Sequence, residues 1–211
     1  DISKLSSKEV EQLYNLDIGN DPTINALGIA AGCNFSLSHK FIPSHQLHII
    51  YYNFPEIGRT TSKVTKSIVE KIEKLYTEEI FQNEDSVAII INGNISDSIH
   101  TYINKLNINF QNNLILSDKI QKEIKNSKYY LEKKQFKNIH IYNIDLLVNN
   151  LFDHTLVPEH TPIRDVNEIK KILDKYNINS TQLPTILNID PISKLIRLVN
   201  GDLVQIKRKS I

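Results

Sequence analysis

The chain carries the stretch Gln182-Leu-Pro-Thr-Ile-Leu-Asn-Ile-Asp190-Pro191, which governs how its C-terminal part folds. Asp190 followed by Pro191 predicts the start of a helix, because an Asp side chain caps free backbone N–H groups and proline suits the first helical position. Ser180, just upstream, is expected to cap a brief helix, in which Pro184 is tolerated only in the first turn. Short elements punctuated in this way indicate a small, compact unit.

Two further motifs flank this stretch and complete the unit. Upstream lies His154-Thr-Leu-Val-Pro-Glu-His160, followed by a predicted helix over Asp165 to Tyr176 with a capping-box-like start at Asp165 and Glu168. Downstream lies Gly201-Asp-Leu-Val-Gln-Ile-Lys-Arg-Lys-Ser210, which predicts a turn around Gly201 and a strand over Leu203 to Arg208. We therefore expect a small α+β domain over residues 150–211, and a separate domain over residues 1–149.

Residues 1–149 show the alternating pattern of an α/β domain. Strands are predicted at Leu47 to Phe54, Val87 to Ile91 and Ile139 to Tyr142. Helices are predicted at Thr61 to Tyr76 and after Ser96, where apolar residues recur at helical spacing. This alternation favours a sheet with some parallel pairing. Residues 107–137, rich in Asn and Lys, are interpreted as a partly helical excursion from that core.

The composition excludes several classes of protein. Apolar residues make up 40% of the 211 residues, as in a globular chain. No apolar run approaches the ~20 residues that span a bilayer, and the polar start shows no secretory signal, so no membrane partner is expected. Cys33 is the only cysteine, which excludes a disulfide within the chain and favours an intracellular, reducing compartment. The net charge of +1 leaves nucleic-acid contact to a local patch or a larger complex.

The histidines permit a metal-binding or a structural interpretation. His39, His45 and His48 lie close together with Cys33 upstream, but their spacing fits no compact zinc module. His154 and the histidine that closes its motif lack an obvious third ligand, which favours a structural or assembly role. The sequence therefore predicts no metal, no cofactor and no catalytic residue.

The three motifs, in this order, resemble those of one family: a small RNA polymerase subunit of archaea whose eukaryotic counterpart is the fifth shared subunit. The resemblance covers His154 to Ser210. Upstream, only the topology of Val87 to Leu106 and Ile139 to Asn150 resembles the end of the eukaryotic N-terminal jaw domain, whose sheet is similar to restriction endonucleases. A two-domain chain is similar to the eukaryotic or large-DNA-virus form, and the divergent N-terminal part favours a viral polymerase.

The resemblance implies a non-catalytic subunit of a multi-subunit, DNA-directed RNA polymerase. Its C-terminal domain is expected to dock on the largest subunit, next to other polymerase subunits, within the virion and host cytoplasm for a virus or the nucleus for a cell. The predicted assembly interface consists of His154, Leu156, Val157, Pro158, His160, Gln182, Leu183, Pro184, Asp190, Pro191, Gly201, Asp202 and Arg208. The basic run Lys207 to Lys209 fits either this interface or a solvated strand edge.

One departure from the family's pattern lies ahead of the third motif. The family usually has Gly-Leu-Lys-Arg at this place, whereas this chain has Arg197-Leu-Val-Asn200. The change removes a flexible residue and alters the local charge. We therefore expect the docking surface to differ there.

The jaw is expected to lie beside double-stranded downstream DNA. Asn94, Ser96 and Ser98 surround a predicted helix start, where exposed backbone N–H groups can hold a phosphate, and Lys105 lies further along the same helix. Such contacts would position DNA without reading its sequence. An ordinary capped helix is the alternative interpretation.

Two other functions fit the residues. The first is a Mg²⁺-dependent nuclease, in which Glu132 and Lys134 provide a local Glu-x-Lys pair, although the segment looks charged and exposed and no partner Asp precedes it. The second is a free-standing transcription adaptor that carries the same C-terminal module.

Overall fold

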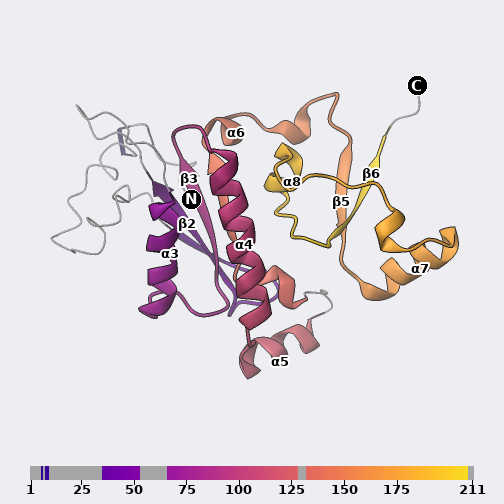
Figure 1. Cartoon of the computed structure of the whole chain (residues 1–211), viewed down its shortest axis with the longest axis horizontal. Helices are drawn as coiled ribbons and strands as arrows, with labels where there is room; N and C mark the ends of the chain where they lie inside the picture. The colour runs from indigo at the N-terminus through magenta and orange to yellow at the C-terminus, as the bar shows by residue number, and fades with distance from the viewer. Residues whose placement is uncertain (1–5, 7, 10–34, 53–65, 128–131, 209–211) are drawn as a thin grey trace.

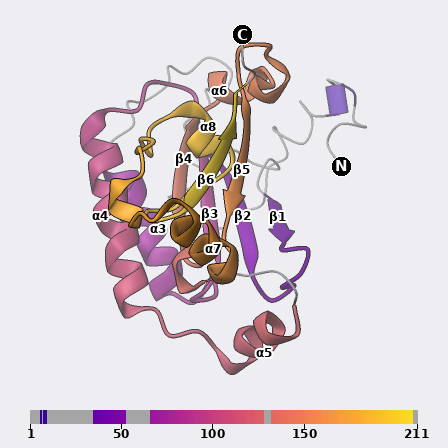
Figure 2. The same ribbon diagram turned by 90° about the vertical axis from the view of Figure 1, so that its right-hand side faces the viewer.

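The computed structural model describes residues 6, 8–9, 35–52, 66–127 and 132–208. These residues form a four-stranded sheet with helices against one face, and a smaller unit built on a two-stranded sheet (Figure 1). Viewed from the side, the smaller unit lies in front of the large sheet rather than at the end of the molecule (Figure 2).

The large sheet has the order β1-β2-β3-β4, with β1 (Phe35–Ser38), β2 (Gln46–Tyr52), β3 (Ser86–Ile91) and β4 (Ile139–Asn143). β2, β3 and β4 are parallel and β1 is antiparallel to β2, so the predicted parallel pairing is confirmed. Helix α3 (Ser67–Thr77) connects β2 to β3, and helix α4 (Asp97–Asn113) follows β3, as parallel neighbours require. The ends of the predicted strand over 47–54 and the start of the predicted helix over 61–76 lie outside the described residues.

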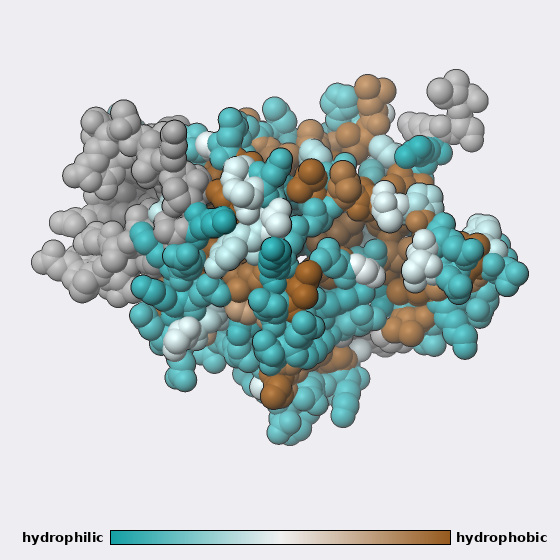
Figure 3. Space-filling model, viewed as in Figure 1, coloured by the Kyte–Doolittle hydropathy of each residue, from teal (hydrophilic) through white to brown (hydrophobic). Residues whose placement is uncertain are grey.

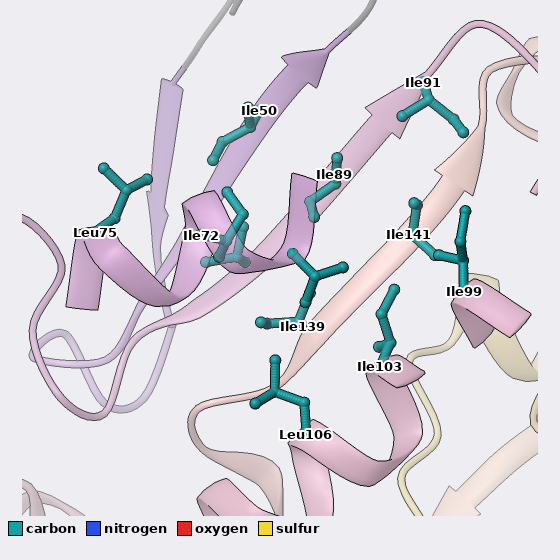
Figure 4. Packing of buried hydrophobic residues seen from close by; sticks show 12 residues of the cluster. Ile50, Ile72, Leu75, Ile89, Ile91, Ile99, Ile103, Leu106, Ile139 and Ile141 are labelled. Atoms are coloured by element: carbon teal, nitrogen blue, oxygen red, sulfur yellow. The ribbon is translucent and has the colours of Figure 1, made fainter. Parts of the chain in front are cut away.

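The two faces of β3 pack against different surroundings because strand side chains alternate. β3 is buried along its whole length, as its β-branched run predicts. Ile89 belongs to the aliphatic cluster that includes Ile72 of α3 and Ile103 of α4 (Figure 4). Ile90 faces the other way, in a smaller cluster with Tyr142 of β4.

The interpretation of residues 107–137 as an excursion is wrong at its start. Helix α4 continues to Asn113, and Asn107 is anchored to the sheet: its side-chain amide donates to the Ile139 carbonyl and accepts from the Ile139 N–H, both at 2.9 Å. Asn107 thus imitates a neighbouring strand at the outer edge of β4, a role that composition does not reveal. Beyond α4, helix α5 (Asp118–Asn126) and the 3₁₀ turn η2 (Lys133–Gln135) enclose a separate buried cluster of Ile42, Leu114, Ile120 and Phe136.

The smaller unit has the predicted α+β composition. Its elements, after the short helix α6 (Asp145–Val148) and the turn η3 (Leu151–Asp153), are β5 (Glu159–Ile163), α7 (Val166–Tyr176), η4 (Ser180–Gln182), α8 (Pro191–Leu195) and β6 (Leu203–Lys207). β5 and β6 pair antiparallel. The predicted turn before β6 is confirmed, and Gly201 occupies it with a positive φ of 82°, which glycine adopts without strain.

The predicted helix starts are confirmed in part. Asp190 caps α8 by accepting from the N–H groups of Ile192 (2.8 Å) and Ser193 (3.2 Å). Asp165 caps α7 by accepting from Asn167 N–H at 2.8 Å, but the structure shows no capping box there. Ser180 is not a cap: it is the first residue of η4, and Asn179 caps it instead. Asn is an equally good cap, so the competing residue one position earlier is used.

A capping box joins Ser6 and Glu9 near the N-terminus. The Ser6 N–H donates to Glu9 Oε2 at 2.7 Å, and the Glu9 N–H donates to Ser6 Oγ at 3.4 Å. None of the described helices combines the length and apolar character that crossing a bilayer requires.

Candidate assembly surface

The first motif forms an exposed corner leading into β5. His154 is exposed, and its Nδ1 accepts from the Leu156 N–H at 3.2 Å. The side chain of Leu156 is 84% exposed. His160 is half-buried in β5, where its Nδ1 donates to the Pro158 carbonyl at 2.7 Å, while Val157 and Pro158 are half-buried. Both histidines therefore hold the local backbone, which fits the structural interpretation.

Exposed large apolar side chains are concentrated on and beside the smaller unit. Figure 3 shows hydrophobic residues gathered over the C-terminal part of the molecule, on the right. They are Leu147, Val148, Phe152, Leu156, Val166, Tyr176, Leu187 and Ile189. Exposed apolar patches of this kind mark surfaces that bind another protein. We name these eight residues the apolar set.

The second motif lies partly within this surface. Gln182 and Pro184 are exposed, Leu183 is half-buried, and Leu187 is 66% exposed. Asp190 and Pro191 serve the start of α8, as described above. The motif therefore combines outward-facing residues with residues that shape the unit from within.

In the third motif, Asp202 is an internal hub rather than an outward-facing group. Its carboxylate is only 1% exposed and lies 3.1 Å from Arg164 Nη2 and 3.4 Å from Lys134 Nζ. It also accepts from Gln135 Nε2 at 3.0 Å and from the Val199 N–H at 3.3 Å. A buried carboxylate needs such partners, because burial without them is costly.

These contacts correct the interpretation of Glu132 and Lys134 as an exposed charged segment. Lys134 Nζ lies 3.1 Å from Glu132 Oε2, 3.4 Å from Asp202, and donates to the Gly201 carbonyl at 3.0 Å. The pair therefore joins η2 to the turn before β6, across 67 positions of sequence. Sequence reasoning missed this role because pairing between distant charges leaves no local signal.

The rest of the third motif follows β6. Arg208 is exposed just beyond the strand, and Lys207 forms an exposed pair with Glu159 at 3.3 Å. Lys209 lies outside the described residues. The position of these charges fits both predicted interpretations, a partner contact and a solvated edge.

A polar seam separates the smaller unit from the large sheet. Tyr142 donates from its hydroxyl to the Lys194 carbonyl at 3.0 Å, and burial raises the pKa of Tyr142 to about 12. Lys194 Nζ donates to His100 Nε2 at 3.2 Å, and burial together with this lysine lowers the pKa of His100. A small pocket opens here between α4, the edge of β4 and the segment after α8; it is lined in part by Asn104, His140, Lys194 and Leu198. We call this region the seam.

The N-terminal histidines are held by hydrogen bonds. His48 donates from Nε2 to Asp85 at 2.9 Å and accepts at Nδ1 from Ser36 Oγ at 2.8 Å. His45 Nε2 lies 3.2 Å from Ser86 Oγ, and burial lowers the pKa of His45 to about 4. Among the described residues no three His, Cys, Asp or Glu side chains group as metal ligands do, and Cys33 lies outside that part of the chain.

The predicted DNA-contacting residues gather on one exposed side of α4. Ser96 precedes the helix, but its Oγ pairs with Ser98 Oγ at 2.9 Å instead of capping a backbone N–H. Asn94, Ser98 and Lys105 are exposed. Ser98 and Lys105 are seven positions apart, so they share a face and lie about 10 Å apart along the axis. Their contact with DNA stays a prediction.

Comparison with known proteins assigns the smaller unit. Residues 149–211 match the family described as RNA polymerase Rpb5, C-terminal domain. The chain is 46% identical over 61 residues to the DNA-directed RNA polymerase subunit Rpo5 of Pyrococcus abyssi, an alignment covering 29% of this chain and 73% of that protein. It is 49% identical over 61 residues to the Rpo5 subunit of Methanosarcina acetivorans, covering 29% of this chain and 77% of that protein.

The chain belongs to the Rpb5 family of RNA polymerase subunits. The resemblance carried by the three motifs is thereby confirmed at the level of the family. The Rpb5 match begins at residue 149, so it includes η3 and every element from β5 to β6, together with most of the apolar set.

Proposed function

We propose that this Rpb5-family chain is a non-catalytic subunit of a DNA-directed RNA polymerase, in which the smaller unit docks on the largest subunit. The observation that carries the proposal is the apolar set: the segment that matches the family also exposes most of the large apolar side chains of the described chain. Few residues of the unit are buried, which fits a module that completes its packing on a partner. Asp190 and Asp202 shape this module from within.

Docking is tested by measuring binding of the full chain to the largest subunit of its polymerase. Leu156→Asp and Leu187→Asp place a charge at two of the exposed apolar positions, and we expect each to weaken binding at least tenfold, since a buried unpaired charge is costly. Ile115→Asp is the matched control, because Ile115 is 81% exposed but lies before α5, outside the family match. Equal binding by wild type and Leu156→Asp would count against this docking surface.

The large sheet and α4 are proposed to form the jaw beside downstream DNA. The exposed row formed by Ser98 and Lys105 supports this placement, since a lysine reaching a phosphate adds affinity without sequence preference. In the assembled polymerase, Lys105→Ala is expected to weaken binding of downstream duplex and to make it less dependent on salt. An unchanged salt dependence would remove Lys105 from the interface.

We place the chain in a viral polymerase, in the virion and host cytoplasm, and a cellular source would place it in the nucleus. The parallel β2-β3-β4 order supports, without deciding, a restriction-endonuclease-like jaw. Stoichiometric presence in purified polymerase separates a subunit from a free-standing adaptor. Mg²⁺-dependent DNA cleavage that disappears in Glu132→Ala would instead favour the nuclease hypothesis.

A further inference from the structure

Arg197 occupies a backbone position that favours glycine. The Leu198 N–H donates to the Ser193 carbonyl at 2.9 Å and the Arg197 N–H to the Lys194 carbonyl at 3.0 Å, which is the pattern of a Schellman motif closing α8. This motif requires a positive φ at its turn residue, and Arg197 has φ 52°. A residue with a Cβ is strained there, so the arginine is retained at a cost in backbone free energy.

The Arg197 side chain is also poorly satisfied. Its Nε is buried and has no hydrogen-bond partner, and no ion pair to Arg197 occurs in the described part of the chain. The neighbouring carboxylates are committed elsewhere, Asp202 to Arg164 and Asp85 to His48. Burial lowers the pKa of Arg197, as expected for a cation withdrawn from water without a counter-ion.

Three other buried side-chain atoms without a partner belong to the same region. Together with Arg197 Nε, they are His45 Nδ1, His140 Nε2 and Ser193 Oγ, the complete set of such atoms among the described residues. Ser193 lies one turn before Arg197. Burial and the Arg197 charge both lower the pKa of His45 and of His140, so both rings lie near the guanidinium. Orphaned polar atoms are rare in proteins, and four in one region indicate a missing common partner.

The seam is also open to a small solute and carries a second cation. The pocket beside β4 is lined by His140, Lys194 and Leu198, which flank Ser193 and Arg197 in space or in sequence. Burial lowers the pKa of Lys194, whose Nζ contacts the neutral acceptor His100 Nε2 rather than a carboxylate. Positive charge in this region therefore exceeds the negative charge available to it.

The chemistry of these groups selects the missing partner. Guanidinium and ammonium groups only donate hydrogen bonds, while Ser193 Oγ and a ring N–H of His140 can donate as well. A water molecule could accept such bonds but could not neutralise the cations. A tetrahedral oxyanion does both, and the flat fork of an arginine matches two of its oxygens. We propose that Arg197 and Lys194, with Ser193 and His140, bind a small phosphate-type oxyanion at the seam between β4 and the end of α8.

The proposed anion would link the two parts of the chain. His140 belongs to β4 of the large sheet, whereas the other three residues belong to or follow α8. Binding should therefore stabilise the folded chain in proportion to the occupancy of the site. This inference does not depend on docking to the polymerase, since it concerns the isolated full chain.

Inorganic phosphate is the probe, titrated into the full chain at constant ionic strength maintained with sodium chloride. Calorimetry and thermal unfolding are expected to show saturable binding and a rising unfolding temperature. Arg197→Gly removes the guanidinium and relieves the positive φ, so this variant should fold well without phosphate and bind it at least tenfold more weakly. Arg197→Lys keeps a charge but loses the fork, and an intermediate affinity is expected. Lys207→Ala, which removes an exposed cation far along the chain, should bind as wild type does.

Three outcomes would overturn the proposal. One is an identical phosphate response in wild type and Arg197→Gly. Another is equal stabilisation by chloride at the same ionic strength, which would indicate general screening. The third is a wild-type chain that shows no saturable binding, which would leave the four orphaned atoms to ordered water.

Discussion

The large sheet and the smaller unit satisfy the same physical requirement in different ways. The sheet buries an unbroken aliphatic cluster between β3, β4 and the two helices, and within residues 67–142 its strands are covered by their own chain. The smaller unit buries only Ile163, Ile192 and Ser193 between residues 149 and 208, and leaves large apolar side chains outside. Its interior is organised by a charged hub at Asp202 instead. One part is therefore stabilised by its own core, whereas the other depends on polar contacts and on a partner.

The hub is the point at which the smaller unit should be most sensitive. Asp202→Ala leaves Arg164 and Lys134 without their shared carboxylate, and we expect a loss of about 3–5 kcal/mol in local stability. Hydrogen exchange should accelerate in β5 and β6 while the large sheet stays protected. Glu159→Ala is the control, since its pair with Lys207 is exposed and contributes about 0–1 kcal/mol. Equal effects of the two variants would contradict the hub.

The aliphatic core predicts the converse pattern. Ile89 is fully buried, so Ile89→Ala should lower the free energy of unfolding by about 2–5 kcal/mol through lost transfer energy and a cavity. Urea unfolding of the large sheet reports this change. Ile115→Ala at an exposed position should change it by less than about 0.5 kcal/mol. If exchange in β5 and β6 rose as much as in β3, the two parts would form one cooperative unit and the comparison would need revision.

Acid should weaken the histidine-rich side of the sheet. His45 is held neutral in the fold by burial, with a pKa of about 4, whereas the unfolded side chain has a pKa near 6.5. The folded state therefore binds fewer protons, and stability present above pH ~6.5 is lost as pH falls toward ~4, with a slope of at most about 1.4 kcal/mol per pH unit. His45→Phe should flatten urea-unfolding stability across this window. Parallel profiles for the variant and the wild type would assign the acid loss to other groups.

The smallest expected effect concerns a helix cap. Asp190→Ala removes the acceptor for two N–H groups at the start of α8, and we expect a loss of about 0.5–2 kcal/mol in the smaller unit. Asp190→Asn, which keeps a capping oxygen, should restore most of it. Thermal unfolding monitored with hydrogen exchange at residues 191–198 separates this local effect from global unfolding. A loss unaffected by the Asn substitution would mean that the charge, not the cap, matters.

Features that depend on neighbouring residues could be predicted from the sequence alone. The β-branched run of β3, the caps at Asp165 and Asp190 and the turn at Gly201 follow from side-chain shape and backbone conformation within a few positions. The three motifs also identified the family, because they lie close together and in order. Ser180 failed only because a second good cap stands beside it.

Which distant polar groups meet is evident only in the folded chain. Lys134 reaches the turn at Gly201 across 67 positions, Asn107 completes the edge of β4 across 32, and Arg197 enters the seam in a strained turn. Apolar periodicity tells which face of an element is buried, but any cation can pair with any carboxylate until the fold brings two of them together. The division has a physical reason: local conformation is set by short-range sterics, whereas the placement of charge is set by long-range packing.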